Sequence, residues 1–128
     1  MDDPLAFLFP VFILKLMLNH LSPIDRVFHA LADPTRRLMV ERLGQGPASV
    51  SELAKPFAMS LPAVVQHLQV LEASGLVQSE KAGRVRTCRI APEVLGTAEH
   101  WLQERRAGWD RKLDRLGAVL AQTEETET

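Results

Sequence analysis

The chain has 128 residues, with 15 Lys and Arg against 16 Asp and Glu, and its formal net charge is -1 at pH 7. This length gives room for one domain with a real core and leaves none for a separate catalytic module. The single cysteine, Cys88, excludes an internal disulfide and an all-cysteine metal site within one subunit, and it fits a reducing cytoplasm.

The charge is unevenly distributed along the chain. When Lys15 and the five acidic residues near the two ends are set aside, residues 21–122 keep 14 basic against 11 acidic side chains, a balance of about +3. We therefore predict a folded domain over residues 21–122 and a solvated, frayed acidic tail over residues 123–128.

The first 20 residues form an apolar N-terminal extension of different composition. Its apolar run, Leu5 to Leu18, is too short for a transmembrane helix, which needs about 20 apolar residues, and Lys15 interrupts it. It also lacks the basic start and the cleavage pattern of a secretory signal. Two interpretations remain: an extra helix that packs on the domain or its partner, or a wrongly assigned start, with translation beginning at Met17. The second is slightly favoured.

Two short helices are expected after this extension. Ser22 and Pro23 open a helix that runs to about Ala32, and Asp33 caps a second one that ends at Gly44 to Pro47. In the second helix we expect a core face and a solvent face, formed respectively by Leu38, Met39 and Leu43 and by Arg36, Arg37, Glu41 and Arg42.

A helix-turn-helix follows. A third helix is expected from about Ser51 to Phe57 and a fourth from Leu61, with Ser60 as the N-cap of the fourth and Gly75 as its stop. Helices joined by so tight a turn form a DNA-binding motif whose second helix enters the major groove. The apolar residues of the fourth helix fall on one stripe, predicted to be buried: Leu61, Val64, Leu68 and Leu71.

The opposite face of the fourth helix is the candidate base-reading surface. It offers small residues and amides, which can pair with base edges, and it has no lysine or arginine. The candidate contacts are Ser60, Pro62, Ala63, Gln66, His67 and Gln69. In the alternative interpretation the glutamines are ordinary surface residues and His67 is a helix-packing histidine.

A basic β-hairpin, Val77 to Ile90, is expected next as the wing. Its turn lies at residues 81–84, and we expect Lys81, Arg84 and Arg86 to contact the DNA backbone. Cys88, on the second strand, is interpreted as a small buried side chain, with a redox-reactive thiol near arginines as the alternative.

A long helix should begin at Pro92-Glu93 and reach as far as Gln122. Its apolar seam is larger than so small a domain can cover, so pairing with a second subunit is predicted, a helix laid along its own domain being the rival. The expected interface residues are Leu95, Trp101, Leu102, Trp109, Leu113 and Leu116.

Three stretches together resemble the ArsR-type winged-helix repressors: LADPTRRLMVERL, SVSELAKPFAMSLPAVVQHLQVLEASGLV and GRVRTCRI. The resemblance covers roughly residues 22 to 120. It implies a homodimeric bacterial transcriptional regulator, usually a repressor, with dimer contacts from the first and last helices.

This chain departs from the family pattern at two places. Many relatives carry a serine and a basic residue where this chain has Val65 and Gln66, and a lysine where it has Gln69, which reduces the helix's share of phosphate binding. Metal-sensing members carry a Cys-x-Cys motif after Glu-Leu, or Asp and His ligands on the last helix. Here the last helix offers His100 with Glu104 four residues on, a weak pair, so no metal site and no cofactor are expected.

The predicted fold is mainly α with a small β-hairpin, a winged helix-turn-helix that dimerises through its first and last helices. No enzyme signature is found. The leading hypothesis is a cytoplasmic repressor that binds an inverted-repeat operator in double-stranded DNA as a homodimer, with no membrane span. The alternative is a dimeric interaction module with weak DNA binding that uses the apolar N-terminus to reach a partner or a membrane.

Overall fold

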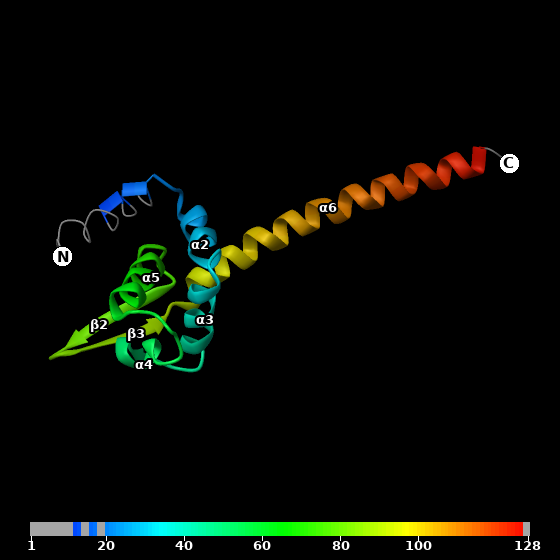
Figure 1. Ribbon diagram of the computed structural model, residues 1–128. Helices are drawn as coiled ribbons and strands as arrows, with labels where there is room; N and C mark the ends of the chain where they lie inside the picture. The colour runs from blue at the N-terminus through cyan, green and yellow to red at the C-terminus, as the bar shows by residue number, and fades with distance from the viewer. Residues whose placement is uncertain (1–11, 14–15, 18–19, 127–128) are drawn as a thin grey trace. The chain divides into compact units, whose positions relative to one another are not determined.

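The computed structural model describes residues 12–13, 16–17 and 20–126, and side chains up to residue 124 (Figure 1). The N-terminal extension lies almost wholly outside these residues, so both interpretations of it remain predictions. The chain forms two units, one ending at Leu95 and the other beginning at Gly96. The elements are α2 (Pro23–Leu31), α3 (Pro34–Leu43), β1 (Ala48–Ser49), α4 (Val50–Ala54), α5 (Leu61–Ala73), β2 (Val77–Ala82), β3 (Val85–Ile90) and α6 (Pro92–Thr126).

The first two helices begin where their caps predict. The Ser22 hydroxyl accepts a hydrogen bond from the Asp25 amide, and the Asp33 carboxylate accepts one from the Arg36 amide. Each cap is followed by a proline at the first helical position, where a missing N–H leaves no hydrogen bond unmade. The expected boundaries of α2 and α3 are therefore confirmed.

The helix-turn-helix is formed by α4 and α5, with two differences from the prediction. Helix α4 starts at Val50 and ends at Ala54, earlier than the expected Phe57, because Pro56 has no N–H with which to continue the helical hydrogen bonds. Ser49 caps it through a hydrogen bond from the Glu52 amide. Residues 48–49, for which no element was predicted, form the short strand β1.

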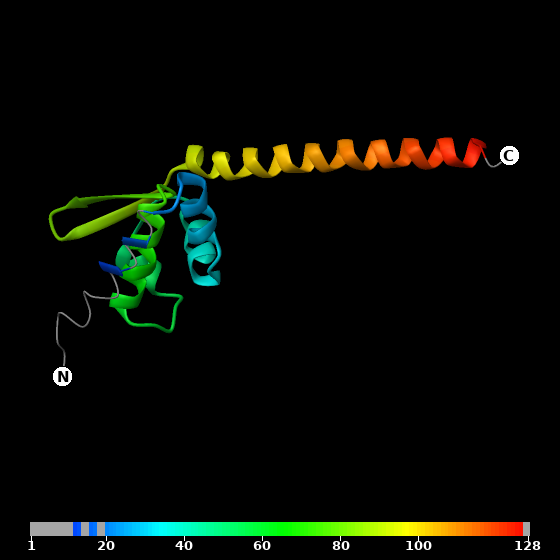
Figure 2. The same cartoon turned by 90° about the horizontal axis from the view of Figure 1, so that it is seen from above.

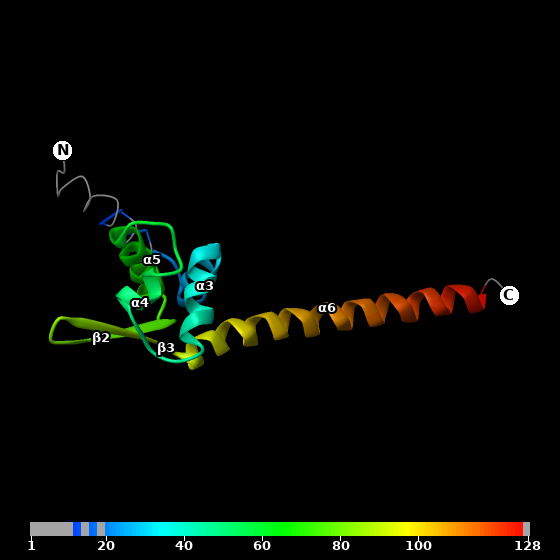
Figure 3. The same cartoon turned by 60° about the horizontal axis from the view of Figure 1, so that its bottom comes forward.

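The wing belongs to a three-stranded antiparallel sheet of order β1-β3-β2. Val77 pairs with Ile90 at the base of the hairpin and Ala82 with Val85 at its tip. The two residues between the strands, Gly83 and Arg84, make the turn, and Gly83 has φ 64°, a left-handed conformation that favours glycine. In three views the hairpin projects away from α4 and α5 (Figures 1, 2 and 3).

The core of the first unit draws on all its helices and strands. Its largest fully buried side chains are Met39, Leu43, Leu53, Val64, Leu71, Leu76, Val77 and Cys88, and α2 and β1 add Val27, Ala30 and Ala48. The stripe predicted on α5 is confirmed at Val64, Leu68 and Leu71, with Val70 as a further buried member.

Two residues expected in the core are exposed. Leu38 is 53% exposed because Met39 and Leu43, four residues apart, define the buried face of α3, and Leu38 is turned about 100° away from Met39. Leu61 is 52% exposed because it is the first residue of α5, next to the exposed cap Ser60, where the helix end reaches the surface.

Helix α6 spans 35 residues and extends beyond the expected end near Gln122. Apolar side chains recur along it but remain exposed, including Leu102, Trp109, Leu113, Leu116 and Leu120. No helix among the described residues has the length and the hydropathy needed to span a membrane.

Candidate nucleic-acid interface

The outer face of α5 carries the predicted base-reading residues. Pro62 and Gln69 are exposed, and Ala63 and Gln66 are half-buried beside them. The Ser60 hydroxyl accepts a hydrogen bond from the Ala63 amide at 3.3 Å, so this serine has a structural role at the start of the helix. The surface therefore offers two glutamine amides among small side chains, close to a helix N-terminus.

His67 is the predicted α5 residue whose surroundings differ most from an open surface. Its side chain is 23% exposed, and its Nδ1 lies 3.7 Å from the Asp33 carboxylate and 3.4 Å from an Arg36 guanidinium nitrogen. These partners lie at the beginning of α3. The imidazole therefore links α5 to the α2–α3 junction, which is the helix-packing role of the alternative interpretation.

Arg36, expected at the solvent face, is half-buried between α2, α3 and α5. Its guanidinium donates hydrogen bonds to the Ala30 carbonyl at 2.8 Å and to the His29 carbonyl at 3.0 Å, which are among the last carbonyls of α2. Burial lowers the pKa of Arg36, and the Asp33 carboxylate partly offsets this effect. The expectation of a solvent-facing Arg36 is thus wrong, because the end of α2 supplies acceptors that local sequence does not reveal.

Asp33 completes this cluster. Partial burial alone would raise the pKa of its carboxyl, but the Arg36 amide, the Arg36 guanidinium and His67 together lower it. The Asp33 carboxylate is therefore held ionised by the α3 N-terminus and its basic neighbours. We name Asp33, Arg36 and His67 the junction cluster.

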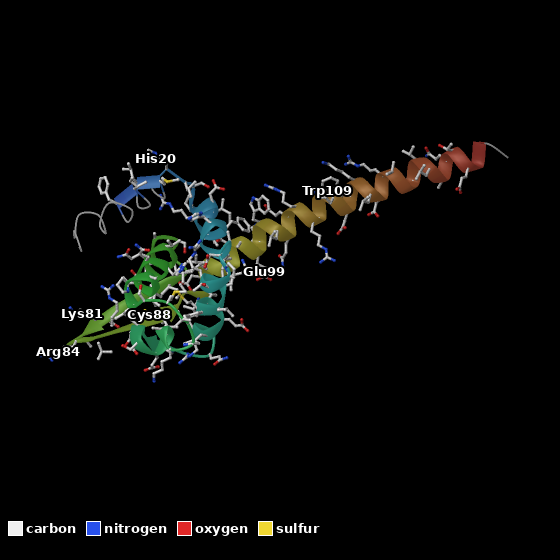
Figure 4. All side chains as sticks on the ribbon, viewed as in Figure 1. His20, Lys81, Arg84, Cys88, Glu99 and Trp109 are labelled. Carbon is white, nitrogen blue, oxygen red and sulfur yellow. The ribbon has the colours of Figure 1, made fainter. Side chains whose placement is uncertain are left out.

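The wing places its three predicted basic residues near its tip. Lys81 and Arg86 are direct cross-strand partners, and Arg84 lies in the two-residue turn; all three are exposed. Figure 4 shows Lys81 and Arg84 near the tip of the hairpin. Because side chains alternate along a strand, Lys81 and Arg86 share the face of the hairpin that carries Cys88 nearer its base. The same face is thus core at the base and cationic at the tip.

Two like charges directly opposite each other destabilise a strand pair. Within the described residues, the ion pairs join other side chains, and none of Lys81, Arg84 and Arg86 has a carboxylate partner. The wing tip is therefore a cationic surface without internal neutralisation, suited to an anion such as a phosphate.

Cys88 is fully buried in the core below this surface. Burial is the main cause that raises the pKa of its thiol, with Glu72 adding to the increase and Arg86 opposing it. A raised pKa keeps the thiol protonated and unreactive. The buried apolar role predicted for Cys88 fits these surroundings better than the redox-reactive alternative.

The candidate metal pair lies apart from any larger ligand set. His100 Nε2 is 3.0 Å from a Glu104 carboxylate oxygen, one turn away on exposed α6. Among the residues that the structure describes, no group of three or more His, Cys, Asp or Glu side chains could hold a metal ion. Tight capture of a transition metal needs such a group.

The predicted dimer residues lie along α6 as a series of exposed side chains. Trp101 and Leu95 are 37% and 39% exposed, whereas Leu102, Trp109, Leu113 and Leu116 are more than half exposed. Figure 4 shows Trp109 projecting from the helix. Lys112 lies over the Trp109 ring, 5.2 Å from its centroid, so its charged group covers part of that apolar surface.

Comparison with known proteins agrees with this architecture. A family model described as a helix-turn-helix domain matches residues 31–80. The HTH-type transcriptional regulator Rv2034 of Mycobacterium tuberculosis is 49% identical over 79 residues, which cover 62% of this chain and 73% of that protein. The transcriptional repressor SdpR of Bacillus subtilis is 27% identical over 79 residues, covering 62% of this chain and 88% of the repressor.

A solved structure gives the same result in three dimensions. The crystal structure of an ArsR family transcriptional regulator aligns with a TM-score of 0.68 and 49% sequence identity, covering 70% of this chain and 98% of the other. The mainly helical fold with a small antiparallel sheet, the two-helix motif and the wing are common to this group. The chain belongs to the ArsR family of winged helix-turn-helix transcriptional regulators, which are DNA-binding proteins and not enzymes.

Proposed function

We propose that this protein is a cytoplasmic homodimeric repressor that binds an inverted-repeat operator in double-stranded DNA. Helix α5 enters the major groove and the wing contacts the adjacent backbone. The carrying observation is the cationic wing tip, where Lys81 lies opposite Arg86 with Arg84 in the turn beside them. A phosphate backbone supplies the negative charge that this arrangement lacks.

Sequence discrimination is assigned to Gln66 and Gln69 of α5. Each amide can donate and accept, and so can make paired hydrogen bonds with an adenine edge. Small neighbours such as Ala63 and Pro62 allow the helix a close approach to the groove. His67 is assigned to the junction cluster, because its Nδ1 faces Asp33 and Arg36.

Dimerisation is assigned to α6, with α2 as the second contributor. A row of side chains as large as Trp109 and Leu113, more than half exposed, is typical of an interface. Two subunits present two α5 helices, which suits half-sites about one turn of DNA apart. In this proposal residues 21–122 form the functional domain, residues 1–20 an extension and residues 123–128 an acidic tail.

We place this protein in a subgroup of the ArsR family that has no metal-sensing site. The residues after Glu52 and Leu53 are Ala54, Lys55 and Pro56, none of which is a metal ligand. The exposed His100 and Glu104 supply two ligands, fewer than the three or four protein ligands of a zinc site. Any signal that releases this repressor is accordingly organic or carried by another protein.

A gel shift on the promoter region of the protein's own gene tests the proposal. We expect a discrete complex that survives an excess of random duplex of equal length and composition. A scrambled duplex is the matched control, since it keeps the phosphate charge and removes the operator. Equal binding to the promoter and the scrambled duplex, or binding to neither, would overturn the proposal and favour an interaction module.

A further inference from the structure

The distal part of α6, residues 102–124, carries a heptad pattern in register with its exposed apolar side chains. In this register Trp109, Leu113, Leu116 and Leu120 occupy four successive core positions, and Leu102 and Thr123 extend the series at its two ends. All four central side chains are between 55% and 64% exposed. Spacings of four, three and four residues match the seam of a left-handed coiled coil.

This part of α6 is poorly suited to stand alone in water. Gly108 and Gly117 lie within it, and glycine inside a helix costs about 1 kcal/mol relative to alanine. A Cβ at Gly117 would meet open space, so no contact with the described residues explains that glycine. Since most helices depend on packing of an apolar face, the exposed seam calls for a partner.

The residues that flank the seam show which partner fits. In heptad notation Arg106, Leu113 and Leu120 occupy the a positions, and Leu102, Trp109, Leu116 and Thr123 occupy the d positions. The position that precedes each a position is called g, and the g positions hold Arg105, Lys112 and Val119. The positions just after each d residue, called e, hold Gln103, Asp110, Gly117 and Glu124. One flank is therefore basic or neutral throughout, and the other is acidic or neutral throughout.

Relative orientation decides whether these flanks attract. In an antiparallel pair the g positions of one helix face the g positions of the other, and e positions face e positions. Basic side chains then face only basic or neutral ones, so no opposite-charge pair can form between the flanks at any register. In a parallel pair each g faces the e position five residues later in the other helix. Arg105 then faces Asp110 of the partner subunit, and symmetry makes this ion pair twice.

We propose that residues 102–124 of two copies form a parallel two-stranded coiled coil, in which Arg105 of each chain pairs with Asp110 of the partner subunit. This proposal rests on the homodimer of the proposed function and specifies its distal geometry. The parallel direction brings the N-terminal ends of the two paired segments together, and likewise their C-terminal ends.

Arg106 supports a two-stranded assembly. It occupies the a position between Leu102 and Trp109. A single basic or polar a residue lowers stability but fixes register and oligomer state, because its charge must reach water at the edge of the seam. Two helices leave that edge open, whereas a trimer or tetramer would enclose more of the charge.

Charge exchange in the full chain tests the ion pair. We expect Arg105→Glu alone and Asp110→Arg alone each to weaken self-association roughly tenfold, because two attractions become two repulsions. Mixing the two variants should restore nearly wild-type affinity, since both interchain pairs become attractive in the mixed dimer. Sedimentation equilibrium with one variant fluorescently labelled measures this preference.

The mixture also separates interchain from intrachain effects. Residues 105 and 110 are five apart and do not face each other on one helix. Arg105→Glu removes the stacking of Arg105 over Trp101, at 4.7 Å from the ring centroid, but mixing cannot restore that stacking. A mixture that associates no better than the separate variants would overturn the parallel pair.

Cysteine cross-linking gives an independent measure of direction. Thr123→Cys lies at a d position and should oxidise to a covalent dimer, whereas Ala121→Cys, on the outer face, should not. A chain that sediments as a dimer but does not cross-link through position 123 overturns the parallel coil and leaves the proposed homodimer standing. A chain that remains monomeric at micromolar concentration overturns both.

Discussion

The recognition helix α5 and the wing use their polar side chains in opposite ways. On α5 the Ser60 hydroxyl caps the helix, and His67 lies against Asp33 and Arg36. On the wing Lys81 and Arg86 oppose each other in the open, with no carboxylate partner among the described residues. Ser60 and His67 of α5 thus serve the fold, whereas Lys81 and Arg86 of the wing remain exposed to a partner.

This difference suggests separate roles, in which α5 is held in a fixed orientation and the wing provides affinity for DNA. A helix fixed by a cap and by the half-buried junction cluster presents its remaining polar groups in a defined direction, as discrimination between bases requires. A cationic hairpin tip attracts any phosphate backbone, and the affinity that it provides falls as the salt concentration rises. Because α5 carries no lysine or arginine, we expect the wing to supply most of the affinity for phosphate.

The largest expected effect comes from removing the wing charges. The double variant Arg84→Ala, Arg86→Ala should weaken binding to operator and random DNA alike, by roughly tenfold at 0.1 M salt for each phosphate that is no longer neutralised. The magnitude of the salt slope should fall by about 0.9 for each such phosphate. Binding isotherms at several salt concentrations measure both quantities.

Arg89 offers a matched control on the same strand. It is exposed but pairs across the strands with Gln78, on the face opposite to that of Arg86 and nearer the base. Arg89→Ala should change the salt slope less than either Arg84→Ala or Arg86→Ala. Equal effects of all three would mean that general charge, and not the wing tip, determines affinity.

We expect substitutions in the junction cluster to lower the stability of the fold more than they lower DNA affinity. Arg36→Ala removes two hydrogen bonds from a charged donor to carbonyls of α2, and we expect it to lower the free energy of unfolding by about 2–3 kcal/mol. Arg37→Ala is the control, because exposed Arg37 makes a single hydrogen bond to the Leu31 carbonyl. Urea denaturation that shows equal losses for the two variants would contradict the special role of Arg36.

A substitution in the base-reading surface of α5 should lower the affinity for the operator and leave the affinity for random DNA unchanged. Gln66→Ala should cost about 1–3 kcal/mol on the operator, because it removes a bidentate pair of hydrogen bonds to a base. Binding to random DNA should stay nearly unchanged, unlike that of the wing variants. Equal weakening on both kinds of DNA would remove Gln66 from base reading, and the comparison between helix and wing would then fail.

The starts of α2, α3 and α5 could be predicted because their causes are local. Ser22, Asp33 and Ser60 each satisfy free amides within the next three residues, and the Gly83 turn needs only its neighbours. Strand β1 could not be predicted, since residues 48–49 are extended through pairing with Cys88 and Thr87, far along the chain. Local sequence contains no trace of that partner.

In the candidate site, too, the features with local causes could be predicted and those that depend on distant residues could not. The wing residues could be named from their charge and spacing, whereas the register that sets Lys81 opposite Arg86 is visible only in the structure. A helical pattern marks Arg36 as polar and so predicts a position in solvent. Its true partners are carbonyls at the end of another helix, whose position depends on the packing of α2 against α3.

Acid sensitivity at Asp33 is a smaller effect that sharpens the comparison. Partial burial acts to raise the pKa of Asp33, but the Arg36 amide and guanidinium and His67 lower it overall. Because the folded pKa lies below the unfolded value, the charge of Asp33 stabilises the fold above pH ~4 and this contribution is lost as pH falls through the folded pKa. Asp33→Ser keeps a capping hydroxyl and removes the charge, so its deficit in unfolding free energy should shrink on acidification. Urea denaturation of both proteins at several pH values measures this deficit, and a deficit that does not change with pH would contradict the stabilising role of the Asp33 charge.

The smallest expected effect is that of metal ions and arsenite on DNA binding. Micromolar zinc, cadmium or arsenite should change operator affinity by less than about twofold, since two exposed side chains do not supply the ligand set that such ions need. His100→Ala is the control, because it removes the imidazole of that pair and should leave the titration unchanged. Release of the operator by any of these ions, abolished in the His100→Ala variant, would place a sensor on α6. It would also mean that an input outside α5 and the wing controls DNA affinity.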